Sequence, residues 1–329
     1  MLNARSKHLV ILLATFNRLH LLKRALESIS SGTTCSHEVI VIDGGSTDGT
    51  IEYLKSLPNI TPVFQGKLLG SSRAYNEVWR QIECKYTCWL SDDTEIVDGS
   101  LDMAIKILEA RPEIGMVGLK MKDTMGPKQW KPYAGGICIY GMLNCNHGVL
   151  SMDLLRAVGF FNESYRAYTI DKDLTASVLC AGKSVVMTKR VSVLHHREWA
   201  EQVGGEFWLS GKVQGEMRGI DNEAIYREKF RFLERSRTLL VSIRFRLGRQ
   251  LGRILFSRAN PGALRWGLSH RDWQVLTEAR FIRITDPIDN RRRPYHLVQR
   301  VPERFLASEA NPHGHLLNAN RRGSVEPGV

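Results

Sequence analysis

Two short acidic segments contain the residues best suited to chemistry. The first, residues 43–50 (DGGSTDGT), contains three glycines together with the carboxylates of Asp43 and Asp48. Glycine lets the backbone turn tightly, so that N–H groups can face a ligand. The two carboxylates can accept hydrogen bonds from a nucleobase or a ribose. A simpler alternative is a glycine-rich turn in which Thr47 or Asp48 caps the next helix.

The second acidic segment, residues 89–95 (WLSDDTE), contains the adjacent carboxylates of Asp92 and Asp93. Two neighbouring carboxylates are costly to bury without a cation. If they are accessible, they suit Mg²⁺ or Mn²⁺, which prefer oxygen ligands and keep coordination positions open for phosphate. An ordinary solvated acidic loop is the alternative.

Both acidic segments follow short apolar runs that are expected to be buried strands. The first 120 residues alternate such runs with segments of helical spacing, which indicates an α/β fold with a mostly parallel sheet flanked by helices. Ligands of such sheets bind beyond the carboxyl ends of the strands. The expected strands are 8–14, 38–42, 61–64, 86–90 and 114–119, with two more in 184–195, and the expected helices are 19–30, 50–57, 71–84 and 100–110.

Neither a G-x-G-x-x-G segment nor a Walker A segment occurs in the chain. The dinucleotide-binding and P-loop interpretations of an alternating α/β sequence therefore lose their main support.

Four segments together resemble the inverting family-2 glycosyltransferases over about residues 8–200. They are TFNR (15–18), DGGSTDGT (43–50), LGSSRAYNEVW (69–79) and SDDTEI (91–96). Each segment alone is a weak signal, but the pairing of the two acidic loops at this separation is specific. The resemblance implies a GT-A nucleotide-diphospho-sugar transferase fold and a hexosyltransferase or related glycosyltransferase activity.

The resemblance also implies roles for individual residues. Asp93 would bind the divalent cation, Mn²⁺ or Mg²⁺, with His195 as a further metal ligand; the alternative is that His195 and His196 form a structural histidine pair. Ser91 stands where many members have Asp or Asn, which leaves Asp93 as the one firmly matched ligand of its loop. Residues expected to bind the nucleotide sugar are Thr15, Asn17, Arg18, Asp43, Gly45, Asp48, Arg73, Asn76 and Asp92.

Residues 168–174 (YTIDKDL) resemble the family's Glu-Asp-x-Asp-Leu segment, with Ile170 in place of the Glu. Asp171 then matches the catalytic base, which takes the proton of the acceptor hydroxyl as that hydroxyl attacks the anomeric carbon. A carboxylate at a helix start can do this if burial raises its pKa. The alternative is that Asp171 or Asp173 caps the helix.

The net charge of +12 is concentrated in the C-terminal part. Residues 227–300 contain 18 Arg and Lys against 6 Asp and Glu, so the rest of the chain is neutral. We therefore predict a GT-A catalytic domain over 1–203, a basic and mainly helical region over 204–307, and a disordered tail over 308–329. Residues 240–258 have the pattern of a basic amphipathic helix, which either binds an anionic membrane or packs on the catalytic domain.

Partners and location follow from these features. A nucleotide-diphosphate sugar is the expected donor and a glycan or lipid-linked glycan the expected acceptor, whereas no motif supports nucleic acid. The chain shows no credible membrane span, and its six scattered cysteines fit a reducing, cytoplasmic compartment. Two alternatives stay open: a sugar-nucleotide nucleotidyltransferase, and an inactive transferase-like protein that binds membrane surfaces.

Overall fold

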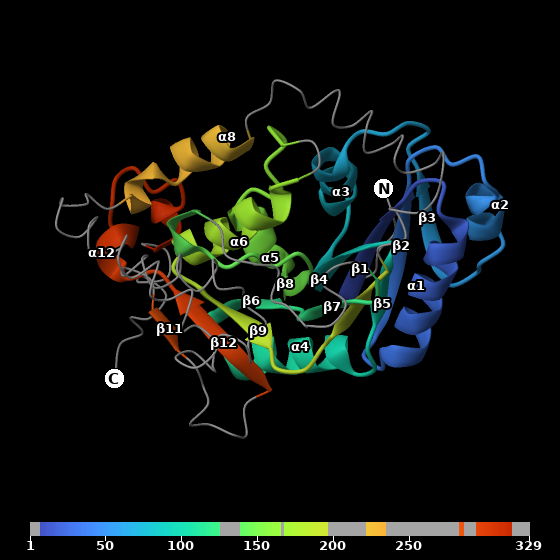
Figure 1. The fold of residues 1–329 in the computed structure, drawn as a ribbon, viewed down its shortest axis with the longest axis horizontal. Helices are drawn as coiled ribbons and strands as arrows, with labels where there is room; N and C mark the ends of the chain where they lie inside the picture. The colour runs from blue at the N-terminus through green and yellow to red at the C-terminus, as the bar shows by residue number, and fades with distance from the viewer. Residues whose placement is uncertain are drawn as a thin grey trace, which may run out of the picture.

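The structure is a computed structural model that describes residues 7–125, 139–165, 168–196, 222–234, 283–285 and 294–317. Its main sheet contains β1 (Lys7–Thr15), β2 (His37–Asp43), β3 (Ile60–Phe64), β4 (Cys84–Ser91), β6 (Ile114–Gly118), β8 (Gly148–Ser151), β9 (Ser184–Thr188), β11 (Arg283–Thr285) and β12 (Tyr295–Arg300). The strand order is β11-β12-β9-β6-β8-β4-β1-β2-β3 (Figure 1).

Seven of the nine described strands of this sheet run in the same direction, and β8 and β12 run in the opposite one. β1 pairs in parallel with β2 and β4, and β2 with β3. β8 runs antiparallel between β4 and β6, and β12 runs antiparallel to β9. The mostly parallel α/β architecture predicted from the sequence is confirmed.

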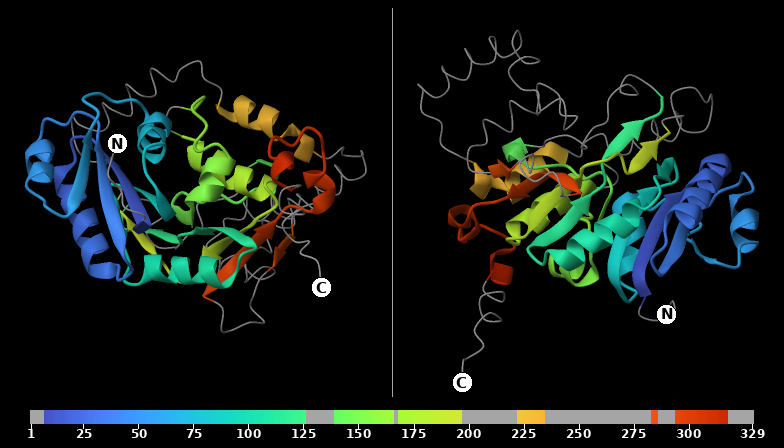
Figure 2. Two further views of the ribbon diagram at one scale, coloured as in Figure 1. Left: turned by 180° about the vertical axis from the view of Figure 1, so that it is seen from behind. Right: turned by 90° about the horizontal axis from the view of Figure 1, so that it is seen from below.

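Helices cover both faces of the sheet (Figures 1 and 2). One face packs against α1 (Leu19–Gly32) and α4 (Ser100–Ala110). The opposite face packs against α3 (Ser71–Trp79), α5 (Met152–Ala157), α6 (Ile170–Cys180), α8 (Asn222–Lys229) and α12 (Glu303–Leu306). The remaining helical elements are α2 (Thr50–Lys55), η1 (Ile139–Gly141) and η3 (Arg231–Leu233).

β1 shows why the strand sequences are almost continuously apolar. Val10 and Leu12 pack on the α3 and α6 side, whereas Leu9, Ile11 and Leu13 pack on the α1 and α4 side. Because helices cover both faces of a parallel sheet, neither face of such a strand needs polar residues.

A second sheet of three short strands stands beside the main one. It contains β5 (Thr94–Ile96), β10 (Val193–His195) and β7 (Met121–Asp123), in the order β5-β10-β7. The central β10 is antiparallel to β5 and parallel to β7.

The end of one predicted helix was wrong. The sequence predicted a helix over 71–84, whereas α3 ends at Trp79 and Cys84 begins β4. Cys84 fits the spacing of the predicted helix, but in the structure it pairs with Lys7 of β1. Pairing within the sheet therefore determines its conformation.

The C-terminal part adds to the main sheet. β12 pairs with β9, and β11 pairs with β12. Residues 308–317, predicted as part of a disordered tail, are instead packed. Asn311 Nδ2 donates hydrogen bonds to the carbonyl oxygens of Cys180 and Leu306, both at 3.0 Å, and His313 is buried. Polar residues are retained here because they satisfy carbonyl groups at helix ends. The segments 204–221, 240–258 and 318–329 lie outside the described residues.

Two further expectations concern membrane-spanning helices and cysteines. No helix in the described ranges has the length and apolar content needed to cross a membrane. Cys35, Cys84, Cys88, Cys145 and Cys180 are free thiols.

An ion pair between the partly exposed Lys229 and the buried Asp173 holds α8 on α6. Lys229 donates hydrogen bonds to Asp173 and to Ser177 Oγ (3.0 Å), and the Tyr165 hydroxyl donates to Asp173 Oδ2 (3.2 Å). Neither Asp171 nor Asp173 occupies the N-cap position of α6, because both lie within its first turn. The residue at that position is Thr169.

We expect Lys229→Met to reduce the free energy of unfolding by about 2–3 kcal/mol, because the change leaves a buried carboxylate without its cation. Arg227→Met is the matched control, since Arg227 pairs with Glu223 on the exposed side of the same helix. It should cost about 0.5 kcal/mol or less. Urea unfolding of both variants measures the difference, and equal losses would contradict a specific role for Lys229.

Candidate active site

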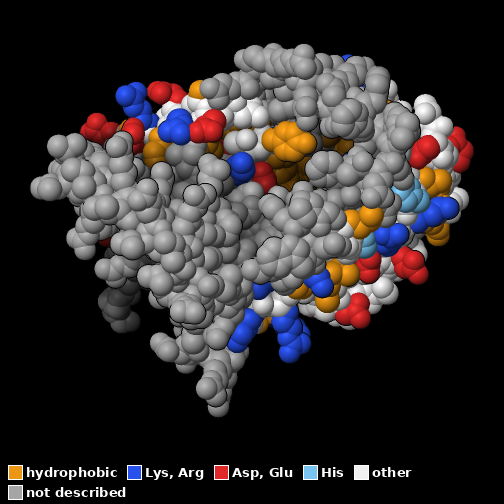
Figure 3. Space-filling model, viewed as in Figure 1, with side chains coloured by type: hydrophobic (Ala, Val, Ile, Leu, Met, Phe, Trp, Pro, Cys, Tyr) orange, Lys and Arg blue, Asp and Glu red, His pale blue; other side chains and the backbone are white. Residues whose placement is uncertain are grey.

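The two acidic segments meet at the carboxyl ends of β1, β2 and β4. Thr15 at the end of β1 lies level with Asp43 of β2, and Ala14 lies level with Ser91 of β4. The parallel register therefore brings both loops to one edge of the sheet, where ligands of α/β sheets bind. On the face shown in Figure 3, acidic, basic and hydrophobic side chains of the described residues gather in a hollow.

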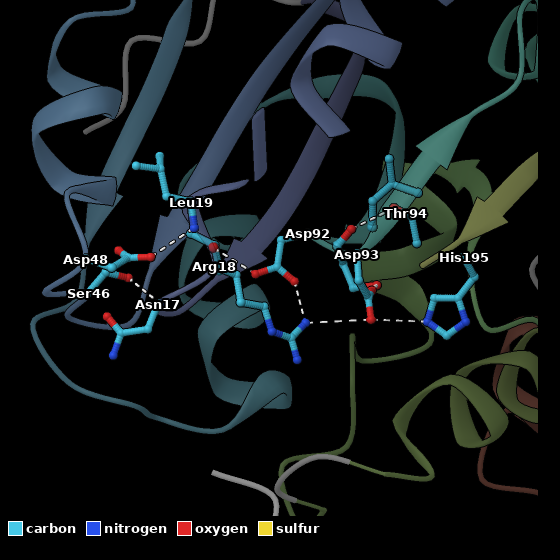
Figure 4. Close-up of polar contacts among 12 residues, drawn as sticks. Asn17, Arg18, Leu19, Ser46, Asp48, Asp92, Asp93, Thr94 and His195 are labelled. Carbon is cyan, nitrogen blue, oxygen red and sulfur yellow. Dashed lines mark hydrogen bonds and ion pairs between the residues drawn. The ribbon is translucent and has the colours of Figure 1, made fainter. Parts of the chain in front are cut away.

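Arg18 connects the two carboxylates of the second loop (Figure 4). Its Nη1 lies 2.7 Å from Asp92 Oδ1 and 3.6 Å from Asp93 Oδ2. Thr15 Oγ1 donates a further hydrogen bond of 2.8 Å to Asp92 Oδ2. The guanidinium thus neutralises part of a buried acidic pair.

Asp93 lies between Arg18 and His195 (Figure 4). Its Oδ2 is 3.2 Å from His195 Nε2, and its Oδ1 accepts a short hydrogen bond from Ser91 Oγ. Burial alone would raise the pKa of Asp93, but the hydrogen bond and charge of His195 and the charge of Arg18 lower that pKa below its ordinary value. Burial raises the pKa of Asp92 despite Arg18. Asp93 is therefore the more firmly ionised of the two.

The glycine-rich loop is held together by Asp43. This fully buried carboxylate accepts hydrogen bonds from the N–H groups of Gly45 (2.9 Å) and Ser46 (3.0 Å). Gly45 has a φ of +95°, and a Cβ there would lie 2.8 Å from the carbonyl oxygen of Gly66. The turn thus requires glycine at this position. Whether Asp43 and Gly45 contact a nucleoside stays a prediction.

Asn17 joins the first loop to the end of β1. Its backbone N–H donates to Ser46 Oγ (2.9 Å), and its Oδ1 accepts from the N–H of Thr47 (2.7 Å). These contacts hold the glycine-rich loop against the end of β1, where Arg18 follows Asn17 in the chain.

Asp48 caps two helices at once. Its Oδ2 accepts the N–H of Leu19, the first residue of α1, and its Oδ1 accepts the N–H and hydroxyl of Thr50, the first residue of α2. Burial alone would raise the pKa of Asp48, but these hydrogen bonds lower it. In this structure Asp48 therefore hydrogen-bonds to the first residues of two helices, as the helix-capping alternative predicted.

Asp171 is half-buried in the first turn of α6. Burial raises the pKa of Asp171, and the charge of Lys172 and a hydrogen bond from Asn144 oppose the shift. Asn144 in turn donates to Asn146 Oδ1 (3.2 Å), and the Asn146 carbonyl accepts the Trp89 indole N–H (2.8 Å). The start of α6 is thereby connected to the end of β4, close to Asp93.

Tyr168 supports the same placement. This residue precedes α6, its side chain is 59% exposed, and it interacts electrostatically with Arg18. The start of the helix that carries Asp171 therefore lies within electrostatic range of Arg18.

Two residues expected to bind the donor have internal partners here. The amide of Asn76 is buried and forms hydrogen bonds with both backbone groups of Phe161, at 2.8 and 3.1 Å. Arg73 is exposed and lies 3.8 Å from Glu163. These contacts attach α3 to the segment before α6, and donor binding by either residue stays a prediction.

Comparison with known families decides the identity of this domain. Residues 10–167 match the family model described as glycosyl transferase family 2. This part of the chain belongs to that family. The protein is therefore a glycosyltransferase, and its α/β architecture is the GT-A type that the sequence predicted.

Solved structures and curated protein sequences were also compared with the chain. A mannosyltransferase from Pyrobaculum calidifontis, PcManGT, solved in complex with GDP-Man and Mn²⁺, is similar in structure with a TM-score of 0.45 and 15% sequence identity. The similarity covers 84% of this chain and 86% of that one. No curated protein sequence matches this glycosyltransferase.

The donor atoms around Asp93 fit a divalent cation. Two neighbouring ligands of an octahedral ion at about 2.1 Å lie about 3 Å apart, and Asp93 Oδ2 and His195 Nε2 are separated by 3.2 Å. In the parts of the chain that the structure describes, no three His, Cys, Asp or Glu side chains are grouped to hold an ion alone. Mg²⁺-type ions are commonly bound by one or two carboxylates together with substrate phosphates, which suits this glycosyltransferase site.

Two residues of the site were not expected from the sequence. Asp123 at the end of β7 contacts His195, and Asn144 contacts Asp171. Asp123 follows the strand 114–118, so the rule that functional residues follow strands points to it. Asn144 has no sequence signal, because its contact depends on the return of the chain through β8.

Proposed function

We propose that this glycosyltransferase moves a sugar from a nucleotide-diphosphate donor to an acceptor hydroxyl with inversion, assisted by Mn²⁺ or Mg²⁺. The observation that carries the proposal is Asp93, a buried and firmly ionised carboxylate 3.2 Å from His195 Nε2 at the carboxyl ends of β1 and β4. Asp93 and His195 would hold the cation, and the donor diphosphate would complete its coordination. A cation in this place offsets the negative charge that develops on the departing nucleoside diphosphate.

The acceptor side is assigned to Asp171. In a single displacement, the acceptor oxygen bonds to the anomeric carbon while the bond from that carbon to the diphosphate oxygen breaks. The Asp171 carboxylate takes the hydroxyl proton. Its raised pKa suits this role, because a base whose pKa lies nearer the working pH accepts a proton more readily.

The donor side is assigned to the loops after β1 and β2. The glycine-rich loop 43–50, shaped by Asp43 and Gly45, would hold the nucleoside together with Thr15 and Asn17. Arg18 is charged and adjacent to the acidic pair, so it can contact the diphosphate. We retain Arg73, Asn76, Asp48 and Asp92 as residues of this donor region.

The acceptor is proposed to be a glycan or lipid-linked glycan used in surface polysaccharide or glycolipid synthesis on the cytoplasmic face of the membrane. This part rests on the basic composition of residues 227–300, which can attract an anionic surface. The division into a catalytic domain over 1–203 and a basic region over 204–307 belongs to the same proposal.

Thermal unfolding with UDP-, GDP-, TDP- and CMP-sugars, each with and without Mn²⁺, tests the donor and the metal. A donor at 100 times its Kd adds about 2.7 kcal/mol of stability. We expect this gain for one class of diphosphate sugar and only with Mn²⁺. CMP-sugars carry a single phosphate and serve as the control.

Two outcomes would count against the proposal. Stabilisation that is equal without Mn²⁺ would remove the metal role. Binding without hydrolysis or transfer of the sugar, over a range of acceptors and with Mn²⁺ present, would favour an inactive transferase-like protein.

A further inference from the structure

His195 lies between two carboxylates. Its Nδ1 is 3.0 Å from Asp123 Oδ1, and its Nε2 is 3.2 Å from Asp93 Oδ2. Asp123 is fully buried and Asp93 is 5% exposed. The imidazole therefore connects an interior carboxylate to the proposed cation ligand.

The register of the small sheet creates this arrangement. β10 is the central strand, and His195 pairs with Asp123 of β7 on one side and with Thr94 of β5 on the other. The N–H of Thr124 donates to the His195 carbonyl (3.0 Å), which extends the pairing past Asp123. Asp123 is thus held against the imidazole by backbone pairing on both sides of their contact.

The chemistry of the imidazole gives Asp123 its role. An ionised carboxylate only accepts hydrogen bonds, so Asp123 favours a proton on His195 Nδ1. Without a cation, a doubly protonated His195 can donate to both carboxylates. A cation beside Asp93 would take the place of the Nε2 proton, and Asp123 would keep the remaining proton on Nδ1. Two electron-pair donors at this distance are stable when a cation lies between them, and metal-bound histidines in proteins commonly donate their other N–H to a carboxylate.

We propose that Asp123 is a positioning residue that holds His195 with Nε2 directed at the cation site beside Asp93. The inference rests on the proposed metal-assisted function and deepens it. Asp123 itself is too deeply buried to reach the donor or the acceptor.

The neighbouring residue provides a matched control. His196 Nε2 lies 2.8 Å from Glu95 Oε2, and its Nδ1 lies 2.9 Å from Thr124 Oγ1. This is the same type of carboxylate–histidine contact on the same small sheet, but the partners of His196 are Glu95 and the Thr124 hydroxyl, neither of which is a proposed cation ligand. Glu95→Ala therefore removes a comparable contact without affecting the ligand atoms.

Titration with Mn²⁺ alone, followed by the electron paramagnetic resonance signal of the free ion, tests the proposal. We expect Asp123→Ala to weaken Mn²⁺ binding by about 10- to 100-fold, and Glu95→Ala to leave it at the wild-type value. In a His195→Ala background, Asp123→Ala should cause no further loss. An unchanged Kd in Asp123→Ala, or an equal loss in both backgrounds, would overturn the positioning role.

A measurement on the unmodified protein keeps the proposal testable if Asp123→Ala does not fold. In the Mg²⁺ complex, nitrogen-15 NMR of His195 should show the proton on Nδ1, and a proton on Nε2 would overturn the inference. Failure of the proposed function looks different, because the wild-type protein would then bind no Mn²⁺, or Asp93→Ala would bind it as well as the wild type.

Discussion

Asp93→Ala should abolish glycosyl transfer while the protein keeps its fold. The variant loses the carboxylate that would bind the cation, and removal of one comparable electrostatic contact costs about 3–4 kcal/mol of activation free energy, or roughly 10²- to 10³-fold in rate. The fold should persist because Arg18 keeps its 2.7 Å ion pair with Asp92. Initial rates of sugar transfer at saturating donor and Mn²⁺ measure the effect.

Glu95→Ala is again the control for Asp93→Ala. This substitution removes one negative charge two residues from Asp93. The Glu95 side chain contacts His196 rather than the proposed cation ligands. Its transfer rate should stay near the wild-type value. If a folded Asp93→Ala protein, checked by circular dichroism, turned over at a near-normal rate, the metal role of Asp93 would be excluded.

Asp171→Asn should keep donor binding and lose transfer. The amide has nearly the same shape as the carboxylate but cannot take the acceptor proton, and loss of a general base lowers kcat by about 10²- to 10⁴-fold. Because burial raises the pKa of Asp171, the wild-type rate should fall on acidification at a pH above the ordinary value for Asp, about 3.9. The variant should lack that acidic limb.

The control for Asp171→Asn is Asp153→Asn. Asp153 is an exposed acidic residue in the first turn of α5, so it tests the same chemical change at another helix start. Parallel measurements of donor-induced stabilisation and of kcat separate binding from chemistry. Loss of donor stabilisation in Asp171→Asn, or an unchanged kcat, would contradict the assignment of the base.

The main sheet could be predicted because its strands are strong local signals. The strands 8–14, 38–42 and 86–90 are largely apolar, because helices cover both faces of the sheet. The small sheet could be predicted only in part, because the second strand expected in 184–195 corresponds to β10, whereas β5 and β7 were not expected. β5, β7 and β10 have three residues each, too few to show a periodicity of two.

The candidate site was predicted in part for the same reason. Loops that follow strands must meet at one edge of a parallel sheet, so the grouping of Asp43 with Asp92 and Asp93 follows from the order of elements. The partners of those carboxylates do not. Asp123 reaches His195 through a pairing between residues more than 70 positions apart, and sequence patterns carry no information on such registers.

The pairing of β12 with β9 bears on how the chain is made. More than 100 residues separate Thr188 from Tyr295, which pair across the two strands. At about 5–20 residues per second, a ribosome needs roughly 5–20 seconds to synthesise that interval. Throughout it, the outer edge of β9 lacks its partner, and unpaired edges promote association between chains. Biogenesis of this enzyme should therefore depend on protection of the nascent β9 edge until β12 has been synthesised.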